Sequence, residues 1–470
     1  MKRTSMMLLG WLGLAGPLLA QQLPTPIVHQ ISAAQAVELA LKQRAEVLNA
    51  RLNIANQEAI NREITGSAYP QVGTNFNLQR NFNIPVTVLP DFISPSVYGV
   101  LEKEGVRDGN GNPIKFDGII NTFPAAFGVP WTASLGISVQ QLLFQPDVFV
   151  GLKARKASLE LYKKQAITQE QTVKKSVLEA YHGVLIAQKG LGFAKESEKR
   201  ISKLYSDQEQ LFKNGFIEKL DLEKTKVTLN NLQSGIIRLT NLVQQSYAGL
   251  KLAMGLPQAD SLVLSDSLTV QNLNEDLLHL GADFKMDNRP EIATLKTSDN
   301  LLGLQIQRYK MQAYPTVAAF WNMATAAQRQ KFDFFDTKQR WFFSNIAGLS
   351  ISVPLTDGGQ RQSRIRQANI ALDQNRHTMR QVEQSIDFEI VSARTQMANA
   401  LEALNNQLEN KELAEKVYAT TKIKYEQGLG SSFEVLQAET ALQDALNNYY
   451  QSMYNAAMAR IGYQKALGKL

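Results

Sequence analysis

The sequence predicts a mainly α-helical chain that also contains four β-strands and arises from an internal duplication. Two stretches without proline, 147–213 and 360–427, carry an apolar residue at almost every seventh position, which on an α-helix forms a continuous seam for a partner helix. The seam of the first stretch recurs 213 positions later in the second. Four shorter segments alternate apolar and polar residues, as strands with one apolar face do.

The two long helices are much longer than an ordinary globular helix. At a rise of 1.5 Å per residue each would extend for roughly 100 Å, which is also far more than the thickness of a bilayer. The matched seam positions are Leu159, Ala166, Val173, Ala180, Ala187, Ala194 and Ile201 in the first stretch, and Leu372, Met379, Ile386, Ala393, Ala400, Gln407 and Ala414 in the second. Because Gln407 is the only polar member, we interpret the pattern as a duplicated coiled-coil rod rather than a compact enzyme domain.

The N-terminal residues and the composition indicate where the protein is located and which partners it lacks. Residues 1–20 begin with Lys2 and Arg3 and continue with a short apolar run, the pattern of a secretory signal peptide, so the mature chain is expected to begin near Gln21. Without those two cations, 48 basic residues stand against 43 acidic ones, interspersed along the helices, which argues against nucleic acid as a partner. The chain has no cysteine, and no later run approaches 18 apolar residues, so only strands could carry it through lipid.

The predicted first repeat covers residues 21–287. It consists of a helix from about Ala33 to Thr65, a β-hairpin of about 69–143, the long helix of about 147–213, a helix of about 218–254 and a connecting segment, 256–287. Ser32 is the expected N-cap of the first helix. The hairpin strands alternate over Val72–Leu78 and Ala133–Val139, and the segment between them, 81–130, is rich in proline, glycine and asparagine, as long exposed loops are.

The predicted second repeat covers residues 288–470 and follows the same order. It consists of a helix that opens at Pro290, a β-hairpin of about 314–356, the long helix of about 360–427 and a final helix of about 432–467. The seams of the two shorter helices also match at an offset of 213: Leu222, Leu229, Ile236, Val243 and Leu250 correspond to Val435, Leu442, Tyr449, Ala456 and Tyr463. Trp341, Phe342 and Phe343 suit the aromatic belt of a membrane interface.

Four strands are too few to form a closed β-barrel. Each unpaired backbone group in lipid costs several kcal/mol, and the smallest single-chain barrels use eight strands. We therefore expect several copies of the chain to share one β-barrel portion. Two copies would leave little lumen, whereas three would give twelve strands and a water-filled passage.

Several short motifs follow one another in a characteristic order. They are Ala68-Tyr69-Pro70, the break Phe212-x-x-Gly215, Arg289-Pro290-Glu291, Ala313-Tyr314-Pro315, Asp357-Gly358-Gly359 and the break Tyr425-x-x-Gly428. In this order they resemble TolC-like outer-membrane efflux proteins, the outer membrane factors of tripartite efflux and type I secretion systems, over essentially the whole mature chain. The resemblance implies a homotrimer with four transmembrane strands per protomer, a twelve-stranded outer-membrane barrel and a long α-helical tunnel (α-barrel).

The resemblance also implies a location and partners. The protein would lie in the outer membrane of a Gram-negative bacterium with a long periplasmic extension. Its partners would be two further copies of itself, a periplasmic adaptor (membrane fusion protein), an inner-membrane transporter and outer-membrane lipid.

By the same resemblance, two loops would dock the adaptor. They are Asn214-Gly215-Phe216 and Gln427-Gly428-Leu429. The alternative is that Gly215 and Gly428 only turn the chain between helices. Asp221 and Glu434, six residues after each glycine, would line the periplasmic entrance, where a threefold ring of acids favours cations and makes gating sensitive to pH. Alternatively, each acid only complements the dipole of its helix. The family's second entrance acid falls on Gln437 and is absent.

The sequence contains no nucleophile constellation, phosphate loop or zinc-ligand spacing. Asp108-x-Asn110-x-Asn112 resembles the start of a calcium loop, but Pro113 replaces the required glycine, so we expect a plain turn. We therefore expect no enzyme, cofactor or metal, and a passive outer-membrane exit duct whose specificity rests with its inner-membrane partner. The alternative is a soluble periplasmic coiled-coil scaffold without pore activity.

Overall fold

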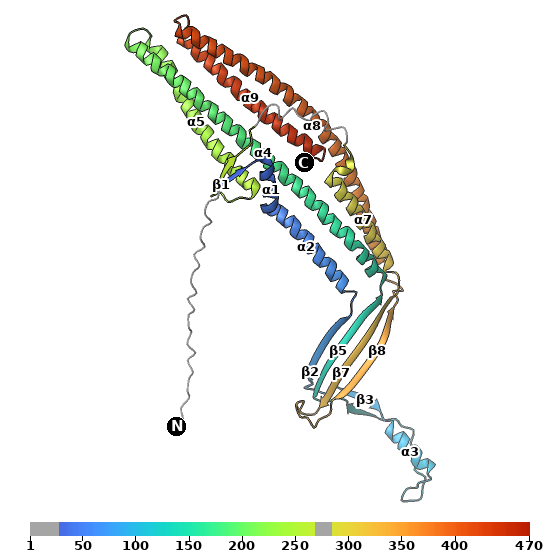
Figure 1. Cartoon of the computed structure of the whole chain (residues 1–470). Coiled ribbons are helices and arrows are strands. Elements are labelled where there is room, and N and C mark those ends of the chain that lie inside the picture. Colours follow the sequence, from blue (N-terminus) through green and yellow to red (C-terminus); the bar gives the residue numbers. More distant parts are fainter. Residues whose placement is uncertain (1–27, 268–283) are drawn as a thin grey trace, which may run out of the picture. The chain divides into compact units, whose positions relative to one another are not determined.

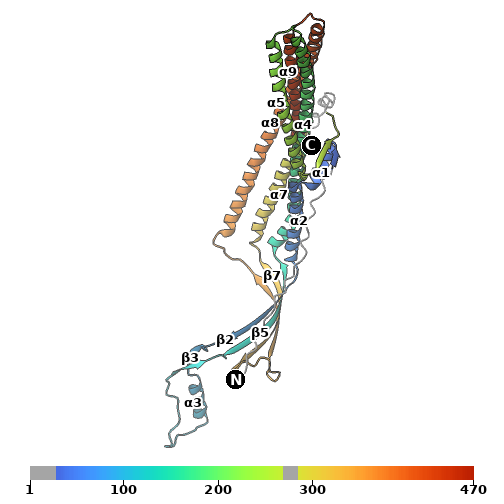
Figure 2. The same ribbon diagram turned by 90° about the vertical axis from the view of Figure 1, so that its left-hand side faces the viewer.

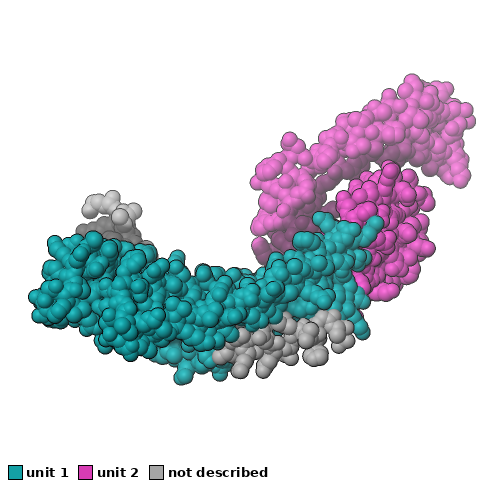
Figure 3. All heavy atoms as spheres, turned by 90° about the horizontal axis from the view of Figure 1, so that it is seen from above, with its two compact units in different colours: residues 1–53, 163–294, 379–470 teal, residues 54–162, 295–378 magenta. Residues whose placement is uncertain are grey.

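The computed structural model describes residues 28–267 and 284–470, and it is mostly helical (Figure 1). The predicted signal peptide, 1–20, and most of the second half of the predicted connecting segment lie outside these residues. The chain divides into two compact units (Figure 3). Unit 1 contains residues 1–53, 163–294 and 379–470, and unit 2 contains residues 54–162 and 295–378. These units are not the two sequence repeats, because each unit takes segments from both repeats.

The long helices are present where the seven-residue pattern predicts them. They are α4 (Pro146–Lys213) and α8 (Gln360–Glu426), and each is followed, after a glycine turn, by a shorter helix, α5 (Lys219–Met254) or α9 (Ser432–Ala466). The two resulting helical hairpins are visible in Figures 1 and 2. All five predicted seam residues of α9 are buried: Val435, Leu442, Tyr449, Ala456 and Tyr463. None of the helices in the described ranges combines the length and apolar character that a membrane crossing requires.

The first predicted helix is divided into two, which corrects the prediction of one helix from Ala33 to Thr65. The structure has α1 (Ala33–Gln43) and α2 (Ala45–Gly66), with Arg44 between them in an extended conformation (φ −64°, ψ 126°). The expected N-cap is confirmed, since Ser32 forms a capping box with Gln35. The break has a tertiary cause: the Arg44 guanidinium donates to the carbonyl oxygen of Leu252 at the end of α5.

Unit 1 also contains a small parallel sheet, of which the sequence indicated only the strand-like residues Leu262–Leu264 in the connecting segment. β1 (Val28–Ile31) pairs with β6 (Ser261–Leu264) in parallel, and each strand has only four residues. The hydroxyl of Tyr181 on α4 donates to the carbonyl oxygen of Ile31 at 3.0 Å, so the sheet is attached to the long helix. Burial, opposed in part by neighbouring hydrogen bonds, raises the pKa of Tyr181 to about 12. Four residues are too few to show a period in sequence.

Unit 2 is organised around a four-stranded antiparallel sheet. Its order is β2 (Gln71–Arg80), β5 (Trp131–Phe144), β7 (Thr316–Arg329) and β8 (Phe342–Ser352). Both predicted hairpins are confirmed by the pairing of β2 with β5 and of β7 with β8. The central pair, β5 and β7, joins the two sequence repeats. Within the described residues, β2 and β8 each have one partner strand, so the outer edge of each is open.

The register places most of the large apolar residues of the four strands on one face of this sheet. That face carries Val72, Phe76 and Leu78 of β2, Ala133, Leu135, Ile137 and Val139 of β5, Val317, Trp321 and Met323 of β7, and Phe343, Ala347, Leu349 and Ile351 of β8. The other face carries Asn75, Asn77 and Gln79, Ser134, Ser138 and Gln140, Asn322 and Gln328, and Ser344 and Ser350. The large apolar exceptions on the polar face are Leu142, Phe320, Phe342 and Ile346, with Ala318, Ala324 and Ala326 beside them, and Asn345 is a polar exception on the apolar face. Four strands therefore build one apolar surface and one polar surface.

The segment 81–130 is more ordered than the loop that its composition predicts. It contains a second hairpin, β3 (Val86–Pro90) with β4 (Thr122–Ala126), and a helix between them, α3 (Ile93–Lys103). The Asp108 carboxylate accepts the backbone N–H groups of Asn110 and Asn112, and these hydrogen bonds lower its pKa. This geometry is the plain turn that the position of Pro113 predicts.

The remaining elements lead into the second repeat. They are a 3₁₀ turn, η1 (Met286–Asn288), and the helix α7 (Pro290–Met311). The three aromatic residues predicted to form one belt are divided. Trp341 packs against Phe334 at a ring separation of 6.0 Å, whereas Phe342 and Phe343 are 65% exposed and, being adjacent in β8, point to opposite faces of the sheet.

Candidate functional site

The two glycine turns at the ends of α4 and α8 have the same backbone geometry. Gly215 and Gly428 are left-handed, with φ of +75° and +74°. The next residues close the turns, since Phe216 N donates to Leu211 O at 2.9 Å and Leu429 N donates to Lys424 O at 2.9 Å. These bonds satisfy carbonyl groups at a helix end and require a left-handed residue, so both glycines do turn the chain. A side chain at Gly215 or Gly428 would meet no atom within 4 Å, so packing does not select glycine there.

Each turn also displays two large apolar side chains. Phe216 is 76% exposed and Leu220 is 55% exposed, and the residues 213 positions later, Leu429 and Phe433, are 77% and 56% exposed. In each case, the turn residue is followed four positions later by the helix residue. We call these four side chains the tip patch. Exposed apolar groups in matching positions are typical of a surface that contacts another protein.

The two predicted entrance acids have different surroundings. Asp221 lies in the first turn of α5, and Lys224 Nζ donates to its Oδ1 at 3.3 Å. Glu434 lies in the first turn of α9, is exposed, and its backbone N–H donates to the Ser431 hydroxyl at 3.2 Å. Both acids therefore stand where a helix dipole favours negative charge. Lys224 Nζ lies 5.7 Å from the ring centre of Phe433, so the beginnings of α5 and α9 are neighbours.

A buried ion pair joins α4 to α9 farther from the turns. Glu439 is 1% exposed, and its carboxylate accepts two hydrogen bonds from Arg200, at 2.9 Å and 2.7 Å, and one from the Ser197 hydroxyl at 2.5 Å. Burial alone would lower the pKa of Arg200, but the hydrogen bonds and charge of Glu439 outweigh burial and raise it. The sequence patterns did not predict this pair. A signal was present, because Glu439 lies four residues after the seam residue Val435, on the buried side of α9.

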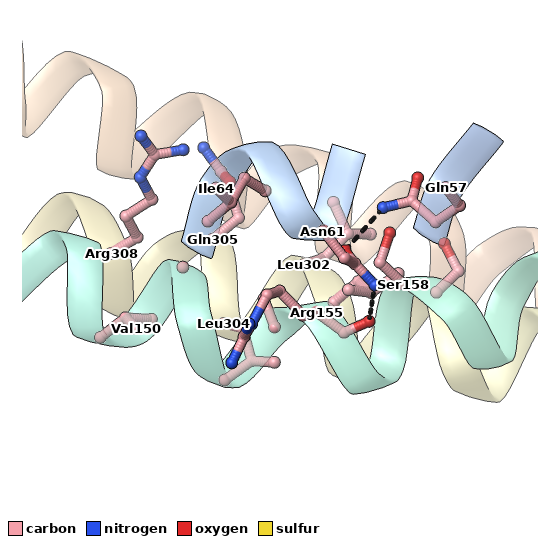
Figure 4. A pocket seen from close by; sticks show the side chains of 14 residues that line it. Gln57, Asn61, Ile64, Val150, Arg155, Ser158, Leu302, Leu304, Gln305 and Arg308 are labelled. Carbon is pink, nitrogen blue, oxygen red and sulfur yellow. Dashed lines mark hydrogen bonds between the residues drawn. The ribbon is translucent and has the colours of Figure 1, made fainter. Parts of the chain in front are cut away.

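A cavity of about 320 Å³ lies in unit 2 between α2, α4 and α7 (Figure 4). Its polar side chains bind one another: Gln57 Nε2 donates to Asn61 Oδ1 at 3.0 Å, and Asn61 Nδ2 donates to the carbonyl oxygen of Arg155 at 3.0 Å. The Arg155 guanidinium donates to the Thr65 hydroxyl and to Leu152 O. The cavity contains no nucleophile paired with a base. In the described part of the chain, no group of three or more His, Cys, Asp or Glu side chains could hold a metal ion.

Comparison with known proteins agrees with this arrangement of helices, strands and turns. The family model described as "Outer membrane efflux protein" matches residues 129–256 and 286–469, which include all four helices of the tip hairpins and three strands of the large sheet. The chain belongs to the outer membrane efflux protein family. The two matched segments correspond to the two copies of the strand and helix pattern.

Individual relatives of this outer membrane efflux protein are distant in sequence. The alkaline protease secretion protein AprF of Pseudomonas aeruginosa is 20% identical over 331 residues, which cover 70% of this chain and 68% of that protein. The outer membrane protein TolC of Vibrio cholerae is 21% identical over 351 residues, which cover 72% of this chain and 77% of that protein. These matches support the TolC-like character that the motif order indicated.

Solved structures of the same kind share the fold of this efflux protein. The outer membrane protein VceC of Vibrio cholerae superposes with a TM-score of 0.66 at 15% identity, over 93% of this chain and 96% of that chain. At this identity the likeness concerns the fold alone.

Proposed function

We propose that this outer membrane efflux protein is the passive exit duct of a tripartite efflux or type I secretion system. Three copies form one channel through the outer membrane of a Gram-negative bacterium, and their long helices extend it into the periplasm as a tunnel. The protein performs no chemistry, needs no cofactor and uses no nucleotide. An inner-membrane transporter supplies the energy, and a periplasmic adaptor connects the two.

The observation that carries this proposal is the four-stranded sheet with one apolar face and two open edges. Leu135 and Ile137 lie on that face and are 47% and 38% exposed, which is costly in water. In lipid the apolar side chains of this face are removed from water. The open edges of β2 and β8 then leave backbone groups without hydrogen-bond partners, at several kcal/mol each. Other copies of the same chain resolve the conflict by pairing β8 of one copy with β2 of the next.

The strand directions support this closure. Each strand is antiparallel to its neighbour in the order β2, β5, β7, β8, so β8 of one copy and β2 of the next would also be antiparallel. Three copies then give a barrel of twelve strands whose polar faces surround a water-filled passage. Two copies would give eight strands and almost no lumen.

The helices supply the periplasmic tunnel. We infer two structural repeats, 21–287 and 288–470, each contributing one long helix and shorter helices aligned along it. The apolar seams of α4 and α8 fit neighbouring helices in the tunnel wall, as coiled-coil seams do.

The tip patch is the proposed adaptor-docking surface, together with the loops Asn214-Gly215-Phe216 and Gln427-Gly428-Leu429. Phe216 and Leu429 are mostly exposed, and their glycine turns hold them in equivalent positions in the two hairpins. Large apolar side chains on rigid turns are the anchors that protein interfaces use.

Asp221 and Glu434 are the proposed acids of the periplasmic entrance. Three copies would bring six carboxylates close to the axis, which would favour cations in the entrance. Because Lys224 partly neutralises Asp221, we assign the larger effect on ion selectivity to Glu434.

The test is purification of the full chain in detergent, followed by mass measurement and planar-bilayer recording. The proposal expects a trimer that resists dissociation by heat and forms ion-conducting pores. A water-soluble monomer without pores would support the soluble periplasmic scaffold instead. Replacement of Glu434 by glutamine should lower the cation preference of the pores, with Gln437→Ala as the control.

A further inference from the structure

The first turns of α8 carry charges of the sign that a helix N-terminus disfavours. A helix N-terminus acts as a partial positive charge, so acidic residues are preferred there. The first turn of α8 has no acidic residue, and Arg361, Arg364 and Arg366 occupy its first two turns. Residues 360–378 contain four arginines and one aspartate, whereas residues 379–426 contain six basic and eight acidic residues. The positive charge is therefore concentrated at the end of α8 that adjoins the sheet.

Two of these arginines are not explained by contacts within the chain. Arg361 pairs with Asp357, which caps the helix. Arg364 and Arg366 are exposed, and the described part of the chain offers neither of them an acidic partner. Neither guanidinium is neutralised within the described residues, so both charges are available to a partner outside the chain.

The corresponding part of α4 also carries exposed cations, although its first turn contains an acidic residue, Asp147. Lys153, which lies 213 positions before Arg366, and Lys156 are exposed. Both line a groove of about 680 Å³ between α4 and α7, in which Lys296 adds a third cation and Glu160 is the only acid. We call Lys153, Lys156, Arg364 and Arg366 the basic collar. All four residues belong to unit 2, which also contains the sheet.

Exposed apolar residues precede the collar on both connections from the sheet. Before Lys153, the side chains of Leu143 and Phe149 are each 50% exposed. Before Arg364, Val353 is 52% exposed and Leu355 is 91% exposed. The order is thus an apolar strand face, exposed apolar residues, and then exposed cations. This order is typical of segments that leave a hydrocarbon layer through its headgroups.

The collar residues differ from Arg155, which lines the neighbouring cavity, in that their side chains have no hydrogen-bond partners among the described residues. Arg155 lies beside Lys156 in sequence, but its guanidinium is held by Thr65 and Leu152 O within the helix packing. No such internal bond holds Lys153, Lys156, Arg364 or Arg366 among the contacts of the described residues. Their charges are therefore available to an external anion.

We propose that the basic collar binds the phosphate groups of phospholipid headgroups in the leaflet that borders the helices. This inference rests on the proposed function, because it places the sheet in lipid. Lys153 is roughly 10 Å along α4 from Pro146, and its flexible methylene stem reaches back toward the headgroup layer. The collar thereby fixes the depth at which the sheet sits in the membrane.

The test measures lipid preference of the full chain in detergent. The protein is titrated with mixed micelles of phosphatidylglycerol or phosphatidylcholine, and retained lipid is counted by native mass spectrometry. We expect the wild type to retain phosphatidylglycerol preferentially. Because each cation near an anionic surface contributes roughly a fivefold preference, K153Q/K156Q/R364Q/R366Q should lose most of it, about 25-fold or more.

Two further variants control this test. The first removes four exposed lysines from the far parts of the same two helices, K195Q/K203Q/K416Q/K424Q, and should leave the preference unchanged. The second keeps the charges, K153R/K156R/R364K/R366K, and should retain phosphatidylglycerol like the wild type. An equal loss in the distal variant, or a loss in the charge-conserving variant, would overturn the inference.

The same samples separate this inference from the proposed function. If every variant forms pores and trimers and none differs in lipid preference, the lipid-binding role of the collar is wrong and the proposed function stands. If the collar variant instead changes the ratio of anion to cation permeability and leaves lipid preference intact, the cations face the passage and the inference is wrong. Displacement of the lipid by millimolar inorganic phosphate would assign the site to free phosphate. Absence of trimers and pores in the wild type would remove both proposals.

Discussion

Arg289 Nη1 donates a hydrogen bond to the carbonyl oxygen of Ala466 at 2.8 Å, and it thereby caps the end of α9. Arg44 makes the equivalent contact with Leu252 at the end of α5. Both arginines are extended, and each binds the glutamate two positions later, Glu46 or Glu291. The helices α5 and α9 are followed by left-handed glycines, Gly255 and Gly468, and each glycine packs against the segment that contains the arginine. The two glycines lie 213 residues apart. The duplication thus extends to a tertiary contact between distant segments.

The first prediction concerns these two arginines. Arg289→Gln should lower the free energy of unfolding by about 2–4 kcal/mol, because Glu291, Glu389 and two carbonyl groups lose a charged donor. Arg44→Gln should cost less, since its side chain is 22% exposed whereas that of Arg289 is 3% exposed. Thermal unfolding of the purified protein measures both. Equal losses of stability in the two variants would contradict the prediction that the more buried arginine contributes more.

The second prediction concerns pH. Burial opposes the charge of Glu291, but the hydrogen bonds and charge of Arg289 outweigh burial and hold the pKa below its ordinary value of 4.5. A lowered carboxyl pKa stabilises the fold above the unfolded value, and this stabilisation is lost as the pH falls through the folded value. Between about pH 6 and about pH 3, the melting temperature should therefore fall more in the wild type than in Glu291→Gln. Glu402→Gln, at an exposed site on α8, should behave like the wild type.

The third prediction concerns the buried ion pair between α4 and α9. Glu439→Gln removes the carboxylate that Arg200 binds and should reduce stability by about 3 kcal/mol. The double variant Arg200→Met with Glu439→Leu should recover most of that loss, since a buried ion pair can be replaced by apolar groups of similar volume. Asp444→Asn on the exposed side of α9 is the matched control. Denaturant unfolding measures the free energy of unfolding of the single variant, the double variant and the control. A double variant as unstable as Glu439→Gln would argue against the pair as the cause.

The fourth prediction concerns the apolar face of the sheet. Leu135→Lys and Ile137→Lys should block membrane assembly, because a lysine on the lipid face of a strand costs about 2–4 kcal/mol near the midplane. Ser134→Lys and Ser138→Lys change the opposite face of the same strand and should be tolerated. Fractionation of cells into membrane and soluble material gives the result. Normal membrane assembly of both Leu135→Lys and Ile137→Lys would favour the soluble scaffold.

The fifth prediction concerns the tip patch. Phe216→Ser with Leu429→Ser should abolish export in cells while trimer formation and melting temperature stay unchanged, because both side chains are already more than 75% exposed. Phe335→Ser, at a site that is 88% exposed in the loop between β7 and β8, should not affect export. Normal export by the tip variant would exclude this surface from docking.

The regular elements could be predicted because each has its own period. The seven-residue seam located α4, α5, α8 and α9 to within a few residues, and the two-residue alternation located both hairpins. Irregular features carried no comparable signal. β1, β3, β4 and β6 have four or five residues each, and each pairs with a strand more than 30 positions away. Of the candidate site, the glycine turns followed from sequence, whereas the matching exposure of Leu220 and Phe433 did not.

The sequence by itself determined the long helices, the shorter helices that follow them, the two large hairpins, the duplication and the family, because helical and strand periods and a repeat at 213 positions are local properties of the chain. Only the tertiary structure decided which elements meet: that β5 pairs with β7 across the repeats, that Arg44 interrupts a helix to cap another, and that Arg200 finds Glu439. These contacts join residues between about 170 and 240 positions apart. No local period encodes such partners, and they form because burial of the helix seams brings the segments together.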